Sequence, residues 1–418
     1  MGEPPGHGVE VVPAGGADPL RERSLLRDLA SRFFLWDAFV DGHRRVEACP
    51  LVLTSAAHGA AVQAAEGAAR VVGRAAALAH DDADERALYR FEPETLRLAA
   101  ASRAASDDAS LMRVDLLLDE RGAWRACEIN ADCPGGHNES FGLPRLARAA
   151  GFAAGRDPTR VVASLVERLV ALASGGAVGV LHATGYAEDL QVCALVAREL
   201  ERRGARAVLA PPTAPTLRGE TLCIQGEPVR ALYRYFPTEW MSGQRNLESI
   251  ARAVERGLVR TLTSFAHIFV QSKLSLARCH ALAARGHLTR EDREIVDRHV
   301  IETYDLLEID ERDLTARQDR WVVKRAMGRV GDEVFVGQLF DQAAWAAVVR
   351  DAYGLARGGE SWVAQPFLRQ RPVPTPWGER LVTLGAYVLD GRFAGYFARV
   401  TPRSHVAYDA LCVPVFVR

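Results

Sequence analysis

The alternation of apolar and polar positions predicts helices early in the chain and strands at its end. From Leu20 to about residue 103 the pattern is mainly helical, with few helix breakers over 55–79. Residues 1–20 carry many Gly and Pro without an apolar period, so we expect a disordered tail. A charged helix is expected over about 290–307. Short β-type runs then predict a largely antiparallel sheet, with strands at 321–324, 333–336, 362–365, 381–384 and 392–397.

A strand–helix–strand unit is predicted in the middle of the chain. It consists of a helix opened by Asp157-Pro158 and closed by Gly175-Gly176, a strand over 177–181, a helix over 188–203 and a strand over 207–210. Such a unit implies a small parallel sheet with helices packed on it. The loop 182–187 would lie at the carboxyl edge of this sheet, where α/β folds bind ligands.

Two β-type runs, 111–118 and 123–130, are joined by turn residues and predict a hairpin. If Leu118 pairs with Ala123, then Arg113 stands opposite Glu128. Because strand side chains alternate, one face carries Arg113, Asp115, Glu128 and Asn130. The other face is apolar and is expected to pack on a core, with Val114, Leu116, Leu118, Cys127 and Ile129.

The polar face of this hairpin has the composition of a magnesium site. Two carboxylates and a carboxamide oxygen are hard ligands that suit Mg²⁺, completed by water and nucleotide phosphates. Arg113 could neutralise charge on a transferred phosphoryl group. The same residues also fit a solvated hairpin face with a cross-strand Arg113–Glu128 ion pair. The Gly-rich polar loop 131–140 that follows Asn130 favours the site.

Lysine is the rarest cation of the chain. Of 52 basic residues, two are lysines, Lys273 and Lys324. Because arginine serves as the general surface cation here, each lysine calls for a specific reason, and a compact ammonium on a flexible stem is suited to reach a phosphate.

Charge and cysteine content exclude several classes of protein. The 418 residues have a formal net charge of −1, which disfavours nucleic-acid or membrane binding by net charge. Seven scattered cysteines without a Cys-x-x-Cys pair argue against a disulfide framework or a structural zinc site. With no visible signal peptide and no apolar run long enough to span a bilayer, we expect a cytoplasmic protein.

Several segments, taken in order, resemble circularly permuted (type 2) ATP-grasp proteins, the group that includes the synthetase domain of glutathionylspermidine synthase. Arg113-x-Asp115 followed by Glu128-Ile-Asn130-Ala-Asp-x-Pro-Gly-Gly is similar to the metal-binding segment of that group. Further similarities are a lysine-bearing strand and glycine-rich flap at 322–331, an adenine-contacting segment at 362–368, an arginine-bearing strand at 394–402, a lysine segment at 271–273, and the segments 182–191 and 233–240. The matches run from about residue 113 to residue 402.

The resemblance implies an α/β (α+β) fold, a circularly permuted ATP-grasp with a Rossmann-like pre-ATP-grasp domain. The expected parts after the tail are a helical segment with the metal-binding hairpin over 21–155, the pre-ATP-grasp domain over 156–260, and the remainder of the nucleotide-binding domain over 261–418. The amidase domain fused to some glutathionylspermidine synthases has no counterpart here.

The resemblance also implies roles for residues that match its motifs. Mg²⁺ would be held by Asp115, Glu128 and Asn130, and Arg113 would be the catalytic residue. ATP would be bound by Lys273, Lys324, Gly328, Gly331, Gln365, Phe367 and Arg399. The loops 132–140 and 182–188 are the candidates for substrate recognition, although His137 and His182 could equally be ordinary loop histidines.

The function implied is an ATP-dependent carboxylate–amine ligase that forms an amide through an acyl phosphate and releases ADP. The expected partners are small-molecule or peptide carboxylates and amines, without nucleic acid or membrane, and a homo-oligomer stays open. Two alternatives remain: a non-catalytic ATP-binding partner of a biosynthetic complex, and another phosphoryl transfer in the same cleft.

Overall fold

The computed structural model describes residues 8–15, 23–40, 42–328, 333–403 and 410–418. Helices and sheets occur in mixed order, which confirms the predicted α/β class. None of the helices in these ranges is long and apolar enough to cross a lipid bilayer.

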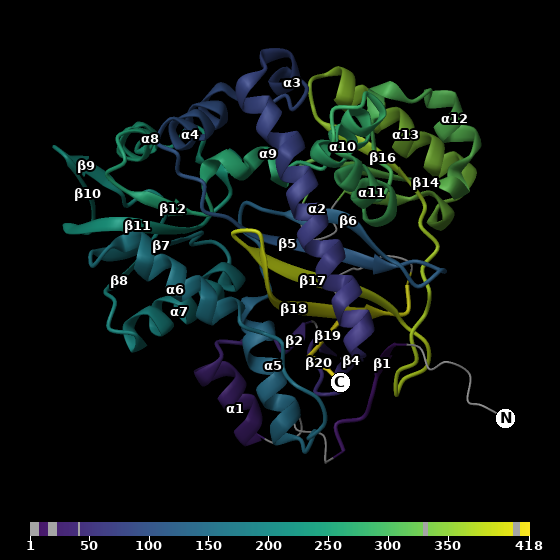
Figure 1. The fold of residues 1–418 in the computed structure, drawn as a ribbon, viewed down its shortest axis with the longest axis horizontal. Coiled ribbons are helices and arrows are strands. Elements are labelled where there is room, and N and C mark those ends of the chain that lie inside the picture. Colours follow the sequence, from purple (N-terminus) through teal and green to yellow (C-terminus); the bar gives the residue numbers. More distant parts are fainter. Residues whose placement is uncertain (1–7, 16–22, 41, 329–332, 404–409) are drawn as a thin grey trace.

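A five-stranded antiparallel sheet occupies the centre of the molecule (Figure 1). Its order is β19-β18-β17-β5-β6, with bounds Leu411–Val413, Arg392–Thr401, Leu381–Leu389, Leu111–Leu118 and Trp124–Asn130. Strand β5 of the predicted hairpin therefore pairs with β17, which lies about 270 residues later in the sequence.

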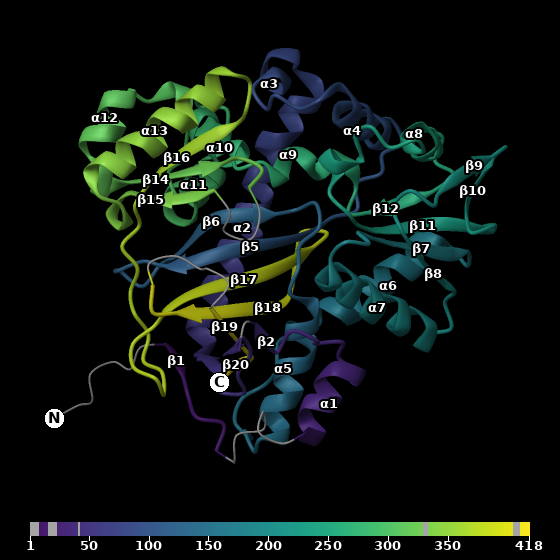
Figure 2. The same ribbon diagram turned by 180° about the vertical axis from the view of Figure 1, so that it is seen from behind.

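The long helix α2, Ser55–Asp81, crosses one face of this sheet (Figure 1). The helix begins after Thr54, whose hydroxyl accepts from the amide of Ala57 at 3.2 Å. Its buried side is mostly alanine, so the helix backbone can approach the sheet closely, and Val114, Leu116 and Ile129 are buried in the same core. The opposite face of the sheet is turned toward the viewer in Figure 2.

A second, four-stranded antiparallel sheet lies next to β6. Its order is β13-β16-β14-β15, with bounds Tyr304–Asp305, Trp362–Pro366, Trp321–Arg325 and Val334–Val336. Two helices, α12 (Glu311–Ala316) and α13 (Gln342–Arg357), share an apolar core with it that includes the buried Trp345 and Trp362.

The third sheet contains the predicted strand–helix–strand unit. The order is β8-β7-β11-β10-β9 with β12 on β11, and the bounds from β7 to β12 are Ala177–His182, Ala207–Ala210, Thr216–Arg218, Thr221–Ile224, Glu227–Tyr235 and Arg260–Leu262. Strands β7 and β8 pair in parallel through α7 (Ala187–Arg202), as predicted. Helix α6 (Val161–Ala173) packs on one face of this sheet. Helix α8 (Leu247–Glu255) belongs to the apolar core on the opposite face.

Smaller elements complete the chain. Two short sheets are β1-β4-β20 (Val9–Val11, Leu51–Leu53, Val415–Val417) and β2-β3 (Phe39–Val40, His43–Arg44). The remaining helices are α1 Arg23–Arg32, α3 Ala83–Ala87, α4 Pro93–Ala104, α5 His137–Ala149, α9 Ile268–Gln271, α10 Leu274–Ala284, α11 Arg290–His299, and the 3₁₀ turns η2 Thr238–Met241, η3 Phe265–His267, η4 Leu306–Glu308, η5 Gln318–Arg320 and η6 Gly337–Leu339.

Four sequence predictions of elements need correction. The strands expected to form one sheet over 321–397 belong to two, because the first three form a sheet with β13 and the last two form a sheet with β5 and β19. The tail expected over 1–20 is wrong for Val9–Val11, which pair with β4 and bury two valines. The helix expected over 290–307 ends at His299, because the amide of Ile301 turns to the carbonyl of Ala126 in β6. The helix expected from Asp157-Pro158 begins at Val161, since the Asp157 carboxylate accepts from the amide of Thr159 instead of capping the helix.

Candidate active site

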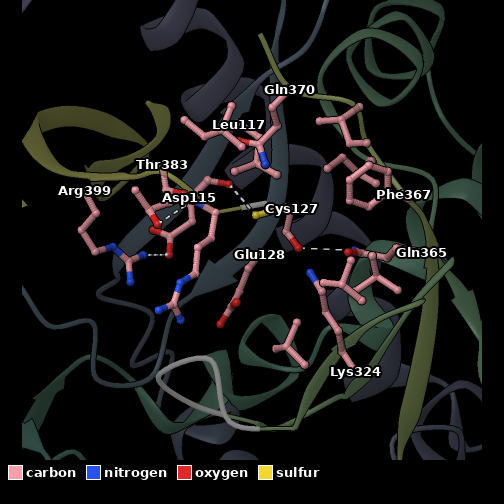
Figure 3. Close-up of a pocket in the computed structure, with 18 of the residues that line it drawn as sticks. Asp115, Leu117, Cys127, Glu128, Lys324, Gln365, Phe367, Gln370, Thr383 and Arg399 are labelled. Atoms are coloured by element: carbon pink, nitrogen blue, oxygen red, sulfur yellow. Dashed lines mark hydrogen bonds and ion pairs between the residues drawn. The ribbon is translucent and has the colours of Figure 1, made fainter. Parts of the chain in front are cut away.

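A cavity lies between the four-stranded sheet and the face of the central sheet opposite α2. It encloses about 980 Å³, part of which is open to solvent. Figure 3 shows Asp115, Thr383 and Arg399 on one wall, Lys324 and Gln365 on the other, and Glu128 between them. Eight of the predicted site residues line this cavity: Arg113, Asp115, Glu128, Asn130, Lys324, Gln365, Phe367 and Arg399.

The β5–β6 hairpin carries the polar floor, in a register that differs from the predicted one. The turn extends to Ala123, whose amide donates to the Asp119 carboxylate, so Leu118 pairs with Trp124. A bulge at Cys127 then shifts the register again. As a result, Asp115 lies directly opposite Glu128.

Two consequences follow from this register. Arg113 stands opposite Asn130, and not opposite Glu128 as predicted. Cys127, expected on the apolar face, lines the cavity, and its thiol donates to the carbonyl of Asp115 at 3.3 Å. Burial raises the pKa of Cys127 to about 11, so the thiol stays protonated at neutral pH.

Asp115 is the most heavily paired group of the floor. Arg113 donates to both of its oxygens, from Nε at 2.7 Å and from Nη2 at 2.9 Å, and Arg399 Nη2 adds a bond of 3.1 Å. Burial by itself raises the pKa of Asp115, but the two guanidinium charges outweigh it and hold the pKa below its usual range. Burial by itself lowers the pKa of Arg113, but the negative charge of Asp115 outweighs burial and raises this pKa above its usual range. The carboxylate and the guanidinium therefore both remain charged.

Glu128 and Asn130 complete the oxygen-rich side of the floor. The Asn130 amide fits its surroundings with its oxygen accepting from Arg113 Nη2 at 3.1 Å and its nitrogen donating to Glu128 Oε1 at 3.2 Å. Glu128 Oε1 also lies 3.4 Å from the ammonium of Lys273. The hairpin thus presents two carboxylates and one amide to the same cavity.

The chemistry of these donors fits magnesium. Within the described ranges, no group of three or more His, Cys, Asp and Glu side chains is arranged to hold a metal. A cation at the floor would take two carboxylates and an amide oxygen from the protein, and the rest of its shell from water or phosphate. This is the usual way in which proteins bind Mg²⁺ at nucleotide sites.

The two lysines lie at or beside the cavity and come from different elements. Lys324, on β14, is 9% exposed and lines the cavity. Lys273 precedes α10 and does not itself line the cavity, but its ammonium donates to the carbonyl of Gly328 at 2.9 Å and contacts Glu128. The carbonyl of Gly328 therefore lies beside the ammonium that contacts Glu128, and Gly331 falls outside the described residues.

The far end of the cavity is apolar. Phe367 contributes to it together with Pro366 and Leu368. The amide of Phe367 donates to the carbonyl of Arg320 at 2.7 Å, so this N–H is engaged within the protein. The side-chain nitrogen of Gln365 donates to Thr303 Oγ1 at 2.9 Å and to the carbonyl of Cys127 at 3.3 Å. The second bond links β16 to β6.

Sequence reasoning missed part of the lining. Besides Cys127, the missed residues include Ile301, Val322, Val336, Leu381, Thr383, Thr401 and Arg403. Several of these alternate with period two along β14, β17 and β18. That alternation would have identified them once the facing strands were known.

The loop after β6 is held by the protein itself. Asp132 is buried, and its carboxylate accepts from Arg234 Nη2 at 2.6 Å and from the amide of Thr238 at 2.8 Å. His137 is also fully buried, which makes it a packed residue and not a surface ligand of the loop. His182 Nδ1 contacts the carbonyl of Ala183 at 3.0 Å. The segment 132–140 is thus held beside the floor, and from His137 onward it is helix α5 and not the predicted loop.

A cavity between two antiparallel sheets, with Lys324 in its lining and Lys273 beside Glu128, belongs here to an α/β fold of the ATP-grasp-like class. Residues 34–418 match the family described as glutathionylspermidine synthase preATP-grasp, and the chain belongs to this family. The family carries the name of a synthase, so the coarse functional class supported is a synthetase-like ligase.

Solved structures are similar to this chain at low sequence identity, and the first of the two below shares its fold. A glutathione synthetase-like effector from Globodera pallida in its apo form is 11% identical, covers 98% of this chain and 100% of its own, and has a TM-score of 0.59. A putative gamma-glutamylcysteine synthetase from Methylobacillus flagellatus KT is 13% identical over 76% of this chain and 84% of its own, with a TM-score of 0.39. No protein with curated annotation matches the chain.

Proposed function

We propose that the protein is an ATP-dependent carboxylate–amine ligase that works through an acyl phosphate. One observation carries the proposal: both lysines of a chain that otherwise uses arginine lie at or beside the cavity that the β5–β6 hairpin lines. Lys324 lines the cavity, and Lys273 lies 3.4 Å from Glu128. We also propose the permuted order of domains, with boundaries near residues 155 and 260.

The nucleotide would lie along the cavity with its phosphates at the polar floor. The ammonium groups of Lys273 and Lys324 would hold the phosphate oxygens, together with the guanidinium of Arg399. The adenine would lie at the apolar end, against Phe367, with Gln365 behind it. The segment of Gly328 and Gly331 would cover the phosphates and exclude water, which would otherwise hydrolyse an acyl phosphate.

Asp115, Glu128 and Asn130 would hold Mg²⁺ at the floor. When bound, the ion supplies charge neutralisation to the phosphate oxygens. Arg113 lies at the same point with a guanidinium that stays ionised, so it can stabilise the negative charge of the transferred phosphoryl group and of the later tetrahedral intermediate.

The reaction balances with no further reagent. An oxygen of the substrate carboxylate attacks the γ-phosphorus of ATP, the bond to the β-phosphate oxygen breaks, and ADP leaves. The nitrogen of a neutral amine then attacks the acyl carbon. The carbon–oxygen bond to phosphate breaks, the nitrogen loses a proton, and an amide and inorganic phosphate remain.

A pair of exposed aromatic rings supports a substrate surface beside this cleft. Tyr186 is 58% exposed and Trp240 is 44% exposed, and their rings stack with centroids 6.2 Å apart. They follow β7 and β11, which are neighbouring parallel strands, so both lie at the carboxyl edge where α/β folds bind ligands. The Asp132–Thr238 hydrogen bonds link this edge to the end of β6.

The test is ADP release from ATP and Mg²⁺, screened over amino acids, short peptides and polyamines with mass detection of the amide. We expect release that requires both an acid and an amine, and loss of release in Glu128→Ala and Lys324→Ala with the fold retained. Full activity in both variants would reject the site. Mg·ATP binding without product from any pair would instead support a non-catalytic nucleotide-binding protein.

A further inference from the structure

Four groups of the protein contact the guanidinium of Arg113. Asp115 accepts from Nε and Nη2, the Asn130 oxygen accepts from Nη2, and the ring of Phe397 lies 5.3 Å from the guanidinium carbon. The fourth group is the carbonyl of Gly135, which accepts from Nη1 at 3.0 Å. Because Asp115 binds the other two nitrogens, this carbonyl adds a second fixed point on the opposite side of the group.

That carbonyl accepts a second hydrogen bond from Tyr387. The Tyr387 hydroxyl donates to Gly135 O at 2.5 Å, and a carbonyl oxygen has two lone pairs for two donors. Tyr387 stands directly opposite Arg113 in the β5–β17 ladder. It is fully buried, and burial raises the pKa of its hydroxyl, so the group remains a donor.

The two glycines of the loop allow its backbone to come this close. Gly136 has a φ of 91°, and a Cβ on it would lie 2.6 Å from the ring of Phe397. A Cβ on Gly135 would lie 2.9 Å from the hydroxyl of Tyr235. The start of the loop is fixed as well, because the amides of Ala131 and Asp132 both donate to one oxygen of Gln271. The carbonyl of Gly135 is therefore held in place by its loop and by the hydrogen bond from Tyr387.

We propose that Tyr387 is a positioning residue which holds Arg113, through the carbonyl of Gly135, in the orientation that stabilises the transferred phosphoryl group. This inference rests on the proposed function. It assigns no contact between Tyr387 and substrate. It predicts that loss of the hydroxyl weakens binding of the transition state and leaves binding of the ground state intact.

The experiment compares two nucleotide probes that need neither acid nor amine. AMP-PNP with Mg²⁺ reports the ground state, and ADP with aluminium fluoride and Mg²⁺ mimics the phosphoryl group in flight. Tyr387→Phe should bind the fluoride complex about 10–100-fold more weakly than the wild type, since a small misplacement of a catalytic group has effects of this order. Its affinity for AMP-PNP should be unchanged.

The matched control is Tyr396→Phe. Tyr396 is an equally buried tyrosine of the same sheet, and its hydroxyl bonds to His58 away from the cavity. It should lose affinity for neither probe. In an Arg113→Lys background, Tyr387→Phe should produce no further loss, because the planar group that it positions is gone.

The outcomes separate this inference from the proposed function. One contrary result is that Tyr387→Phe lowers the affinity for both probes equally, and another is that it lowers the melting temperature without changing the ratio of the two affinities. Either result would assign Tyr387 a structural role and overturn the inference. Unchanged affinity for the fluoride complex would overturn it too, while leaving the ligase proposal in place. A wild-type protein that binds neither probe would reject the proposed function and the inference with it.

Discussion

At the scale of single residues, the floor of the cavity is a balance of buried charges. Asp115 is paired with two guanidinium groups, and Glu128 with the ammonium of Lys273. Each charge is compensated within the protein, which is a condition for keeping ionised groups in a partly enclosed site. A triphosphate would enter among cations that are already oriented.

Lys324→Ala should weaken the binding of Mg·ATP. The ammonium would make a charge-assisted contact with phosphate, and losing such a contact costs about 1.5–3 kcal/mol, or about a 10–100-fold increase in Kd. Isothermal titration calorimetry would measure it. Lys324→Arg should recover part of the affinity through its charge, and an unchanged Kd in the alanine variant would place the phosphates elsewhere.

His137 should make the stability of the protein depend on pH. Burial, with a smaller effect from the charge of Arg113, lowers the pKa of His137 to about 3, whereas an unfolded histidine has a pKa of about 6.5. Between these values the unfolded chain takes up a proton that the folded protein excludes. Stability is therefore retained above about pH 6.5 and falls as the pH is lowered, by up to about 1.4 kcal/mol per pH unit.

The measurement is urea unfolding of the wild type and His137→Phe between pH 7 and pH 4. The free energy of unfolding of the wild type should fall more steeply than that of the variant as the pH decreases. Parallel curves would show that His137 is not excluded from protonation in the folded state.

At the scale of elements, the β5–β6 hairpin explains why the site was predictable although its register was not. The predicted and observed partners of Arg113 differ by two residues, and a shift of two leaves residues 128–130 on their predicted faces. Arg113, Asp115, Glu128 and Asn130 therefore converge under either register. Residues 124–127 are the exception, because the pairing of 124–126 shifts by one and the bulge adds Cys127, which alternation alone does not reveal.

The boundaries of other elements depend on contacts that local sequence does not contain. The helix at 290–299 ends where Ile301 meets β6, and the strand at Val9–Val11 exists because β4 pairs with it. The strand–helix–strand unit at 177–210, by contrast, was predictable in type and nearly in extent, since its apolar periods are strong.

Gly136→Ala should destabilise the protein more than Gly175→Ala. Both glycines have positive φ, 91° and 85°, which costs an alanine about 1 kcal/mol or more. At Gly136 the new methyl group would also meet Phe397, whereas no described atom lies within 4 Å of the corresponding position at Gly175. Thermal unfolding of both variants checks the order, and equal losses would show that Phe397 yields freely.

At the scale of the whole molecule, the cavity exists because segments distant in sequence assemble around it. The floor comes from residues 111–130, and the facing walls come from 321–403. The pairing of β5 with β17 has no local signal. The family resemblance supplied the expectation that these segments meet, whereas periodicity supplied only the faces that each strand offers.

Mg·ATP should stabilise the whole protein because its site joins two sheets. A ligand that binds only the folded state at 100 times its Kd adds about 2.7 kcal/mol. Differential scanning fluorimetry should show a higher melting temperature with ATP and Mg²⁺, and a smaller rise with ATP in EDTA. Equal shifts in the two conditions would argue against a metal at Asp115 and Glu128.

Lys273 contacts both Glu128 and the carbonyl of Gly328. These contacts bear on the order in which a metal ion and a nucleotide would bind. A bare divalent ion that approached Glu128 would meet a resident positive charge and be repelled. An ion escorted by a triphosphate brings its own counter-charge, to which the lysine can transfer its hydrogen bonds. Under the proposed function the metal would therefore enter together with the nucleotide, and Lys273 would then give up its hydrogen bond to the carbonyl of Gly328.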